Sequence, residues 1–295
     1  MIYVSSACIK SKTIRESVCS LAEAGFKNIE LSGGTKYYPE YERDLLQLQD
    51  KYALNYQVHN YFPPPEKSFV LNLASLNDQI YRQSINLALN AIKLSKKLGS
   101  ERYGIHAGFL IDIKSEEVGK NISYNLPSNR AKAIKRFCDA WEIISIEAGN
   151  NVDLYIENNV LSHSNVKTYS GKNPFFLTNY KGYLELKACI DFNLLLDIAH
   201  LNVSANSLGF NFNKDLNRLL LLSDYIHISE NDGLHDQNKP ITKKSKLLDK
   251  IHGYSLKEKC IVIEVYDDIS KIFTSYGAIK NLLEFEKNEN LIGGK

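Results

Sequence analysis

The 295-residue sequence lacks the signatures of several protein classes. Its five cysteines, at positions 8, 19, 138, 189 and 260, are widely spaced and include no Cys-x-x-Cys pair. This pattern argues against a disulfide framework and a thiolate zinc site, and it is typical of reduced thiols in the cytosol. No run approaches the roughly 18 apolar residues of a membrane span, and the first residues lack a signal-peptide pattern. We therefore expect a cytoplasmic protein with no membrane partner.

An excess of charge of one sign is also lacking. The chain has 36 basic and 34 acidic residues, which gives a formal net charge of +2. Such a balance provides no overall field to attract nucleic acid or an anionic membrane surface. We therefore expect a small-molecule substrate and do not expect nucleic acid as a partner. Nothing in the sequence specifies an interface, so association into homo-oligomers stays open.

Short apolar or aromatic runs alternate with longer segments of helical periodicity along the whole chain. Eight strand–helix units in a row predict a parallel sheet, and eight parallel strands close into a barrel. We predict a single (β/α)8 domain over residues 1–295, with a C-terminal tail that frays after about residue 287. The predicted strands are Ile2–Ser5, Lys27–Leu31, Asn55–His59, Arg102–His106, Val152–Glu157, Ile190–Asp197, Tyr225–Ser229 and Cys260–Val265.

The segments between these strands predict helices and two long loops. A doubly wound open sheet is the alternative fold, but it normally carries a GxGxxG phosphate loop after an early strand. The only candidate, Gly33-Gly34, lacks that spacing. The predicted helices are 13–24, 41–52, 77–98, 130–148, 180–188, one ending over 216–223, 243–252 and 270–286; the long loops are 108–128 and 158–176.

Metal-competent residues follow the apolar runs at six of the eight strand ends. One histidine or glutamate in such a place is more often a loop residue or a helix cap, but a barrel brings all its strand ends to one mouth. Carboxylates with imidazoles and no thiolate suit zinc, manganese, cobalt or magnesium. Glu30, near the end of the second strand, faces the same mouth, in a substrate-binding or a structural role. The set is His59, His106, Glu157, Asp197, His200, His227 and Glu264.

Several segments, spread over almost the whole chain, resemble the xylose-isomerase-like barrel superfamily. They are GFKNIELSGG, VHNYFPPP, YGIHAG, LYIENN, LLLDIAHL, DYIHISENDG and VIEVYD. That superfamily includes sugar phosphate isomerases and epimerases and the related apurinic/apyrimidinic endonucleases. The resemblance implies that one divalent metal is held by Glu157, Asp197, His227 and Glu264. It also implies that His200 contacts substrate, and that His59 and His106 match further ligands of the multi-zinc endonuclease branch.

The loop after the seventh strand departs from the endonuclease pattern. Where that branch has an Asp-x-His pair, this chain has Asp236-Gln237-Asn238. The histidine is replaced by Asn238, which argues against a complete three-zinc site. An arginine that some ketose epimerases carry after the strand-seven histidine has no counterpart here either.

Two enzymatic hypotheses and one non-catalytic hypothesis follow. The first is a metal-dependent sugar or sugar phosphate isomerase or epimerase that moves a proton through an enediolate, with Glu157 and Glu264 as the proton-transferring carboxylates. The second is a zinc-dependent phosphodiester hydrolase acting at abasic DNA, which the near-neutral charge disfavours. The third is a barrel that only binds a sugar. In the first hypothesis the substrate-binding residues are His59, His106, His200, Asp236 and Asn238.

Overall fold

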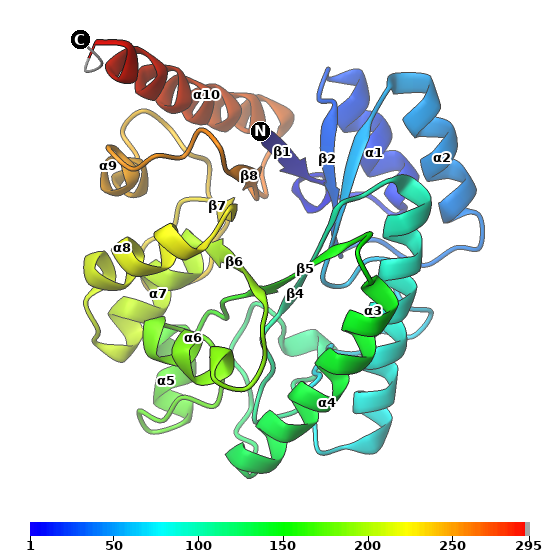
Figure 1. The fold of residues 1–295 in the computed structure, drawn as a ribbon, viewed down its shortest axis with the longest axis vertical. Helices are drawn as coiled ribbons and strands as arrows, with labels where there is room; N and C mark the ends of the chain where they lie inside the picture. The colour runs from blue at the N-terminus through cyan, green and yellow to red at the C-terminus, as the bar shows by residue number, and fades with distance from the viewer. Residues whose placement is uncertain (293–295) are drawn as a thin grey trace.

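The computed structural model describes the backbone of residues 1–292 and the side chains of residues 1–284. The eight strands form one closed parallel barrel in which each strand pairs with its neighbours in the sequence and β8 pairs with β1. Helices surround the strands (Figure 1). The predicted (β/α)8 fold is therefore confirmed. The strands are β1 Ile2–Ser5, β2 Asn28–Leu31, β3 Asn55–His59, β4 Arg102–His106, β5 Asp153–Glu157, β6 Asn193–Asp197, β7 Tyr225–Ile228 and β8 Cys260–Ile263.

Local capping signals set several helix boundaries. Thr13 and Glu16 form a reciprocal capping box at the start of α1, and Asn77 accepts backbone hydrogen bonds at the start of α3. Gly99 ends α3 in the left-handed conformation, with φ 66°, which favours glycine. The helices are α1 Ile14–Glu23, α2 Tyr41–Tyr52, α3 Asp78–Leu98, α4 Arg130–Ala148, α5 His163–Thr168, α6 Tyr180–Lys187, α7 Ile198–Leu208, α8 Phe212–Leu222, α9 Lys246–Ile251 and α10 Ile269–Ile292, with short 3-10 turns η1 Ser6–Cys8 and η2 Ser115–Glu117.

The structure corrects parts of the sequence prediction. The helix α7 was not predicted, because Asp197 both ends β6 and caps α7, with no turn residue between them. The second long loop contains α5, a six-residue helix without the apolar periodicity that reveals longer helices. The strand predicted from Ile190 begins only at Asn193.

The end of the chain was expected to fray after about residue 287. The helix α10 continues to Ile292, and residues 293–295 lie outside the described part of the chain. Fraying of this tail stays a prediction. Within residues 1–292, no helix combines the length and apolar character needed to cross a membrane.

The interior of the barrel is layered. Side chains alternate between the two faces of a strand, so residues two apart share a face. A buried apolar cluster of Tyr3, Tyr155, Leu195, Tyr225, Cys260 and Val262 comes from five of the strands. Glu157, Asp197, His227 and Glu264 each stand two residues after a member of this cluster. The metal-competent side chains therefore form the next layer towards the carboxyl mouth, above a packed floor.

The two long segments after β4 and β5 pack against each other beside this mouth. Phe109 and Phe175 form an isolated antiparallel bridge, and their ring centroids lie 4.9 Å apart. Ile122, Leu161 and Tyr169 belong to the same small apolar cluster. This second cluster fixes both segments as a wall of the mouth.

Gly104 in β4 links the barrel packing to the mouth, and we expect Gly104→Ala to destabilise the fold. A Cβ atom there would lie 2.7 Å from Leu195 Cδ1 and 3.1 Å from His59 Cδ2, so both side chains would have to move. Overpacking of this kind costs roughly 1–3 kcal/mol, measurable by urea unfolding. Gly277→Ala in α10 is the matched control, because its Cβ would meet nothing within 4 Å. A Gly104→Ala protein as stable as the wild type would contradict this packing.

Candidate metal centre

Glu157, the last residue of β5, lies at the centre of the polar layer and is fully buried. One carboxylate oxygen, Oε2, lies 2.8 Å from His59 Nε2 and 3.2 Å from His106 Nδ1. The other oxygen, Oε1, lies 3.4 Å from His200 Nδ1 and 3.5 Å from His227 Nδ1. Imidazoles from β3, β4, α7 and β7 therefore converge on one carboxylate, as the shared mouth of a parallel barrel requires.

Asp197 ends β6 and is the N-cap residue of α7. Its Oδ1 accepts a hydrogen bond from the backbone N–H of His200 at 2.6 Å, which satisfies an amide that the first helical turn leaves unpaired. Its Oδ2 lies 3.7 Å from His200 Nε2. The Asn158 side chain ties β5 to β6, because it donates to the Asp197 carbonyl at 2.9 Å and accepts from the Asp197 N–H at 2.8 Å. The Asp-x-x-His spacing thus places its acid and its imidazole in one cluster.

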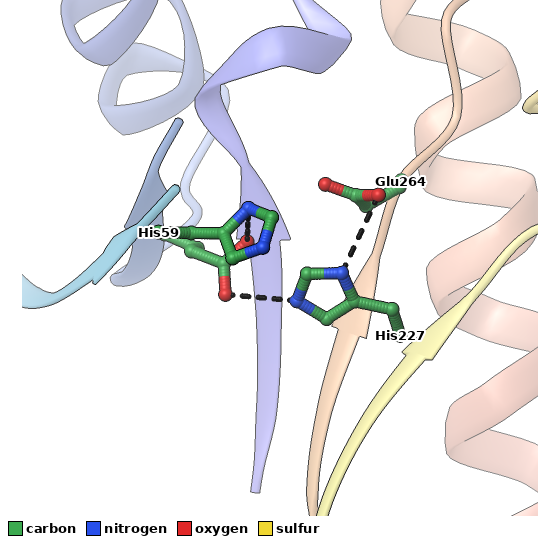
Figure 2. A group of neighbouring side chains, drawn as sticks. His59, His227 and Glu264 are labelled. Carbon is green, nitrogen blue, oxygen red and sulfur yellow. Dashed lines mark hydrogen bonds and ion pairs between the residues drawn. The ribbon is translucent and has the colours of Figure 1, made fainter. Parts of the chain in front are cut away.

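The ring of His227 lies among three carboxylates. Its Nδ1 atom lies 3.4 Å from Glu264 Oε2 and 3.5 Å from Glu157 Oε1. Its Nε2 atom lies 3.0 Å from Glu30 Oε2. Figure 2 shows this ring between the side chains of His59 and Glu264, with one nitrogen turned towards the Glu264 carboxylate. The two nitrogens of His227 therefore face different acids.

The buried atoms of this layer that have no hydrogen-bond partner include Glu157 Oε1, Asp197 Oδ2 and His227 Nδ1. These side chains bring their ligand atoms within 4.8 Å of one another. Because buried polar atoms in proteins are nearly always partnered, such a donor set fits a divalent cation. Glu264 Oε2, close to His227 Nδ1, supplies a fourth donor. Oxygen and nitrogen donors without sulfur suit zinc, manganese, cobalt or magnesium.

A second set of possible metal donors lies around Oε2 of Glu157. The rings of His59 and His106 have centroids 5.9 Å apart, and those of His106 and His200 lie 5.7 Å apart. His106, Glu157 and His200 also bring ligand atoms within 4.8 Å of one another. The buried carboxylate of Glu157 is therefore shared between two groups of imidazoles.

Burial and neighbouring charges set the protonation of the cluster. Burial raises the pKa of Asp197 to about 7 and lowers the pKa of His106 to about 4. Burial also opposes ionisation of Glu264, but the adjacent His227 lowers the Glu264 pKa to about 2. Against its own burial, Glu157 has a pKa held well below the usual range by the surrounding imidazoles. Acids and imidazoles thus neutralise one another, and a bound cation would displace protons from the imidazoles.

A cavity of about 590 Å³ opens over this layer, a volume suited to a small-molecule ligand. Its wall also includes Tyr61, Phe109, Phe175 and Tyr266. Of the nine site residues predicted from the sequence, Asp197 and His227 are buried and do not line the cavity. The other seven line it: His59, His106, Glu157, His200, Asp236, Asn238 and Glu264.

Asp236 and Asn238 reach the cavity from the segment that follows β7. Asp236 Oδ2 lies 3.4 Å from His200 Nε2, and Asp236 Oδ1 has no hydrogen-bond partner. Asn238 is buried in the left-handed conformation, with φ 45°, and its carbonyl accepts a hydrogen bond from the Tyr266 N–H at 2.9 Å. The residue that breaks the endonuclease pattern therefore lies at the mouth.

The sequence reasoning missed the roles of three further residues. Asn158, directly after Glu157 in LYIENN, holds Asp197 through two hydrogen bonds that no sequence pattern indicates. Tyr225 reads as a strand residue but donates a hydrogen bond to Glu30. The sequence does not decide between a substrate-binding and a structural role for Glu30, which contacts the candidate ligand His227 and does not line the cavity. In the sequence, only the two-residue spacing of Tyr225 and His227 along β7 indicates that two of these side chains share a face.

Comparison with known families agrees with this geometry. The sequence model of the family described as xylose isomerase-like TIM barrel matches residues 20–250 of the chain. The chain belongs to this family. Members of the superfamily are mostly enzymes, among them epimerases, isomerases and an endonuclease.

Individual relatives are distant. The uncharacterized protein MJ1311 of Methanocaldococcus jannaschii is 24% identical over 240 residues, which cover 80% of this chain and 72% of that protein. A crystal structure of a D-tagatose 3-epimerase-like protein is similar with a TM-score of 0.71 and 20% identity, covering 98% of each chain. Endonuclease IV from Thermus thermophilus is similar with a TM-score of 0.61 and 14% identity, covering 96% of this chain and 98% of that one. At these identities the two structures show the shared fold.

Because the orphaned donors fit a cation, we expect Mn²⁺ or Zn²⁺ to stabilise the metal-free protein. At a free metal concentration 100 times Kd, the free energy of unfolding should rise by about 2.7 kcal/mol. Asp197→Asn should lose most of this gain. Asp224→Asn should keep it, because Asp224 accepts from the Tyr155 hydroxyl at the other end of the barrel. Denaturant unfolding with and without metal measures the gain, and equal gains in all three proteins would contradict the site.

Proposed function

We propose that this chain is a divalent-metal-dependent isomerase or epimerase of a sugar or sugar phosphate. The observation that carries the proposal is the placement of Glu157 and Glu264 within 3.5 Å of His227 Nδ1, with both carboxylates lining the cavity. The metal ligands in this proposal are Glu157, Asp197, His227 and Glu264. The free cysteines support a cytoplasmic location.

The reaction we propose moves a proton on a carbon next to a carbonyl. A divalent ion supplies Lewis acidity, which stabilises the negative charge of an enediolate. Glu157 takes the proton from one side of the substrate carbon and later releases it to water, and Glu264, once it has gained a proton from water, delivers that proton from the other side. Their strands, β5 and β8, are three places apart in the ring of eight, which supports an approach from different sides.

Polar residues around the cavity would hold the substrate. His200 donates through Nδ1 to the Asn158 carbonyl at 3.0 Å, so its Nε2 is left to contact a substrate oxygen beside Asp236. His106, neutral near pH 7 through its lowered pKa, and His59 would contact hydroxyl groups. Asn238 offers an amide, which both donates and accepts, where the endonuclease pattern has an imidazole.

We expect Glu157→Gln and Glu264→Gln each to slow proton exchange between a ketose and deuterated water by roughly 10²–10⁴-fold. Glutamine keeps the size of the side chain but cannot take a proton. Mass spectrometry of deuterium in free ketoses, D-tagatose among them, and in ketose phosphates measures the rate. Glu101→Gln is the control, because Glu101 is an exposed carboxylate at the amino end of β4. Exchange at the wild-type rate in both site variants would reject the two assigned roles.

A zinc-dependent phosphodiester hydrolase of the apurinic/apyrimidinic endonuclease type is the second candidate function. The contacts of His59 and His106 with Glu157 Oε2 favour it, because they offer donors for a further metal. Asn238 and the near-neutral net charge disfavour it. Incision of a duplex containing one abasic site, together with more than one firmly bound zinc ion per chain, would support the hydrolase over the isomerase.

A further inference from the structure

Glu30, the third residue of β2, is a buried carboxylate that the proposed reaction does not use. It is 0% exposed, and among residues 1–284 no lysine or arginine nitrogen lies within 4.0 Å of its carboxylate. A buried charge without a partner is costly. The hydrogen-bond partners of Glu30 are instead one tyrosine hydroxyl and one imidazole, that of His227, which suggests a role at that ring.

The contact with His227 is the closer of the two imidazole contacts. The Tyr225 hydroxyl donates to Glu30 Oε2, and His227 Nε2 lies 3.0 Å from the same oxygen. Because a carboxylate accepts, Nε2 of His227 carries a hydrogen atom. When a metal ion is bound, Nδ1 would give up its proton and turn its lone pair towards the side of Glu157 and Glu264, at 3.5 Å and 3.4 Å.

His59 lies near the other carboxylate oxygen of Glu30 but is not hydrogen-bonded to it. Its Nδ1 lies 3.8 Å from Glu30 Oε1 and 3.4 Å from Ser32 Oγ. Its Nε2 lies 2.8 Å from Glu157 Oε2. The centroids of the His59 and His227 rings are 4.7 Å apart, and the rings are inclined by 70°. His59 therefore donates through Nε2 to Glu157, and of the two rings only that of His227 is hydrogen-bonded to Glu30.

We propose that Glu30 is a positioning residue of the metal centre. It holds the Nε2–H of His227, so that Nδ1 is left to bind the metal on the side of Glu157 and Glu264. This inference rests on the proposed metal site but assigns Glu30 no contact with substrate. Tyr225 in turn fixes the carboxylate of Glu30.

The competing role for Glu30 is that of a metal ligand. Glu30, His59, His227 and Glu264 do bring ligand atoms within 4.8 Å of one another. However, Oε2 of Glu30 already accepts from Tyr225 and His227. A metal on that side would also take Nε2 of His227 and leave Nδ1 protonated against Glu157. The two roles therefore differ in which nitrogen of His227 binds the metal.

The test compares zinc affinity in the full-length wild type, Glu30→Gln, Glu30→Leu and Tyr225→Phe, by competition with a chelator. Removing a carboxylate behind a histidine ligand typically weakens metal binding by about 10–100-fold. We expect a loss in this range for both Glu30 variants and a smaller loss for Tyr225→Phe. Asp224→Asn, which removes another carboxylate that accepts from a tyrosine, should bind zinc as the wild type does. Glutamine preserves shape, so it keeps the test valid if Glu30→Leu does not fold.

Nitrogen-15 NMR of the histidines in the zinc-loaded protein separates positioning from a structural role. We expect zinc on Nδ1 of His227, with its Nε2–H proton far downfield. In the Glu30 variants this N–H resonance should move upfield. Unchanged zinc affinity in both Glu30 variants, or zinc on Nε2 of wild-type His227, would overturn the proposal. Normal zinc binding without ketose proton exchange would reject the proposed reaction and leave the role of Glu30 standing.

Discussion

The buried carboxylate of Glu157 shapes the whole carboxyl mouth of this barrel. A carboxylate removed from water costs several kcal/mol unless positive or donating groups surround it. Here four imidazoles, from His59, His106, His200 and His227, lie within 3.5 Å of its two oxygens. These rings come from separate elements, so their common contact exists only when the barrel is closed. Folding and assembly of the candidate metal centre are therefore one event.

The strand period of two explains why such a cluster is tolerated in the interior. Tyr155 and Tyr225 fill the barrel two residues before Glu157 and His227, and Val262 does the same before Glu264. This apolar floor excludes water from the side of the cluster that faces the barrel interior. The cavity leaves the opposite side open to a ligand. The polar groups are thus dry on one side and accessible on the other. That asymmetry suits chemistry on a bound small molecule.

The fold and the members of the cluster could be predicted from the sequence because both depend on local patterns. Each strand is a short apolar run, and each candidate ligand stands at its end or within one residue of it, as His106 does in YGIH. The family and the barrel are confirmed, whereas the roles of the site residues stay predictions. The start of α7 was not predictable by the same means, because Asp197 serves as strand end and helix cap at once.

The individual atomic contacts within the cluster also could not be predicted from the sequence. Which oxygen of Glu157 faces which ring, and which nitrogen of His227 faces Glu30, depend on side-chain angles that no spacing encodes. Glu30 illustrates the limit. Its position in NIEL places it near the mouth, but only the closed barrel brings it to Tyr225, 195 residues further along the chain.

The central claim is that one divalent metal lies among Glu157, Asp197, His227 and Glu264. Crystals grown with one equivalent of Zn²⁺ and measured at the zinc absorption edge test it directly. The account predicts an anomalous peak about 2.0–2.2 Å from His227 Nδ1 and from oxygens of the three carboxylates. A strongest peak elsewhere, or a peak bound by Nε2 of His227, would contradict it.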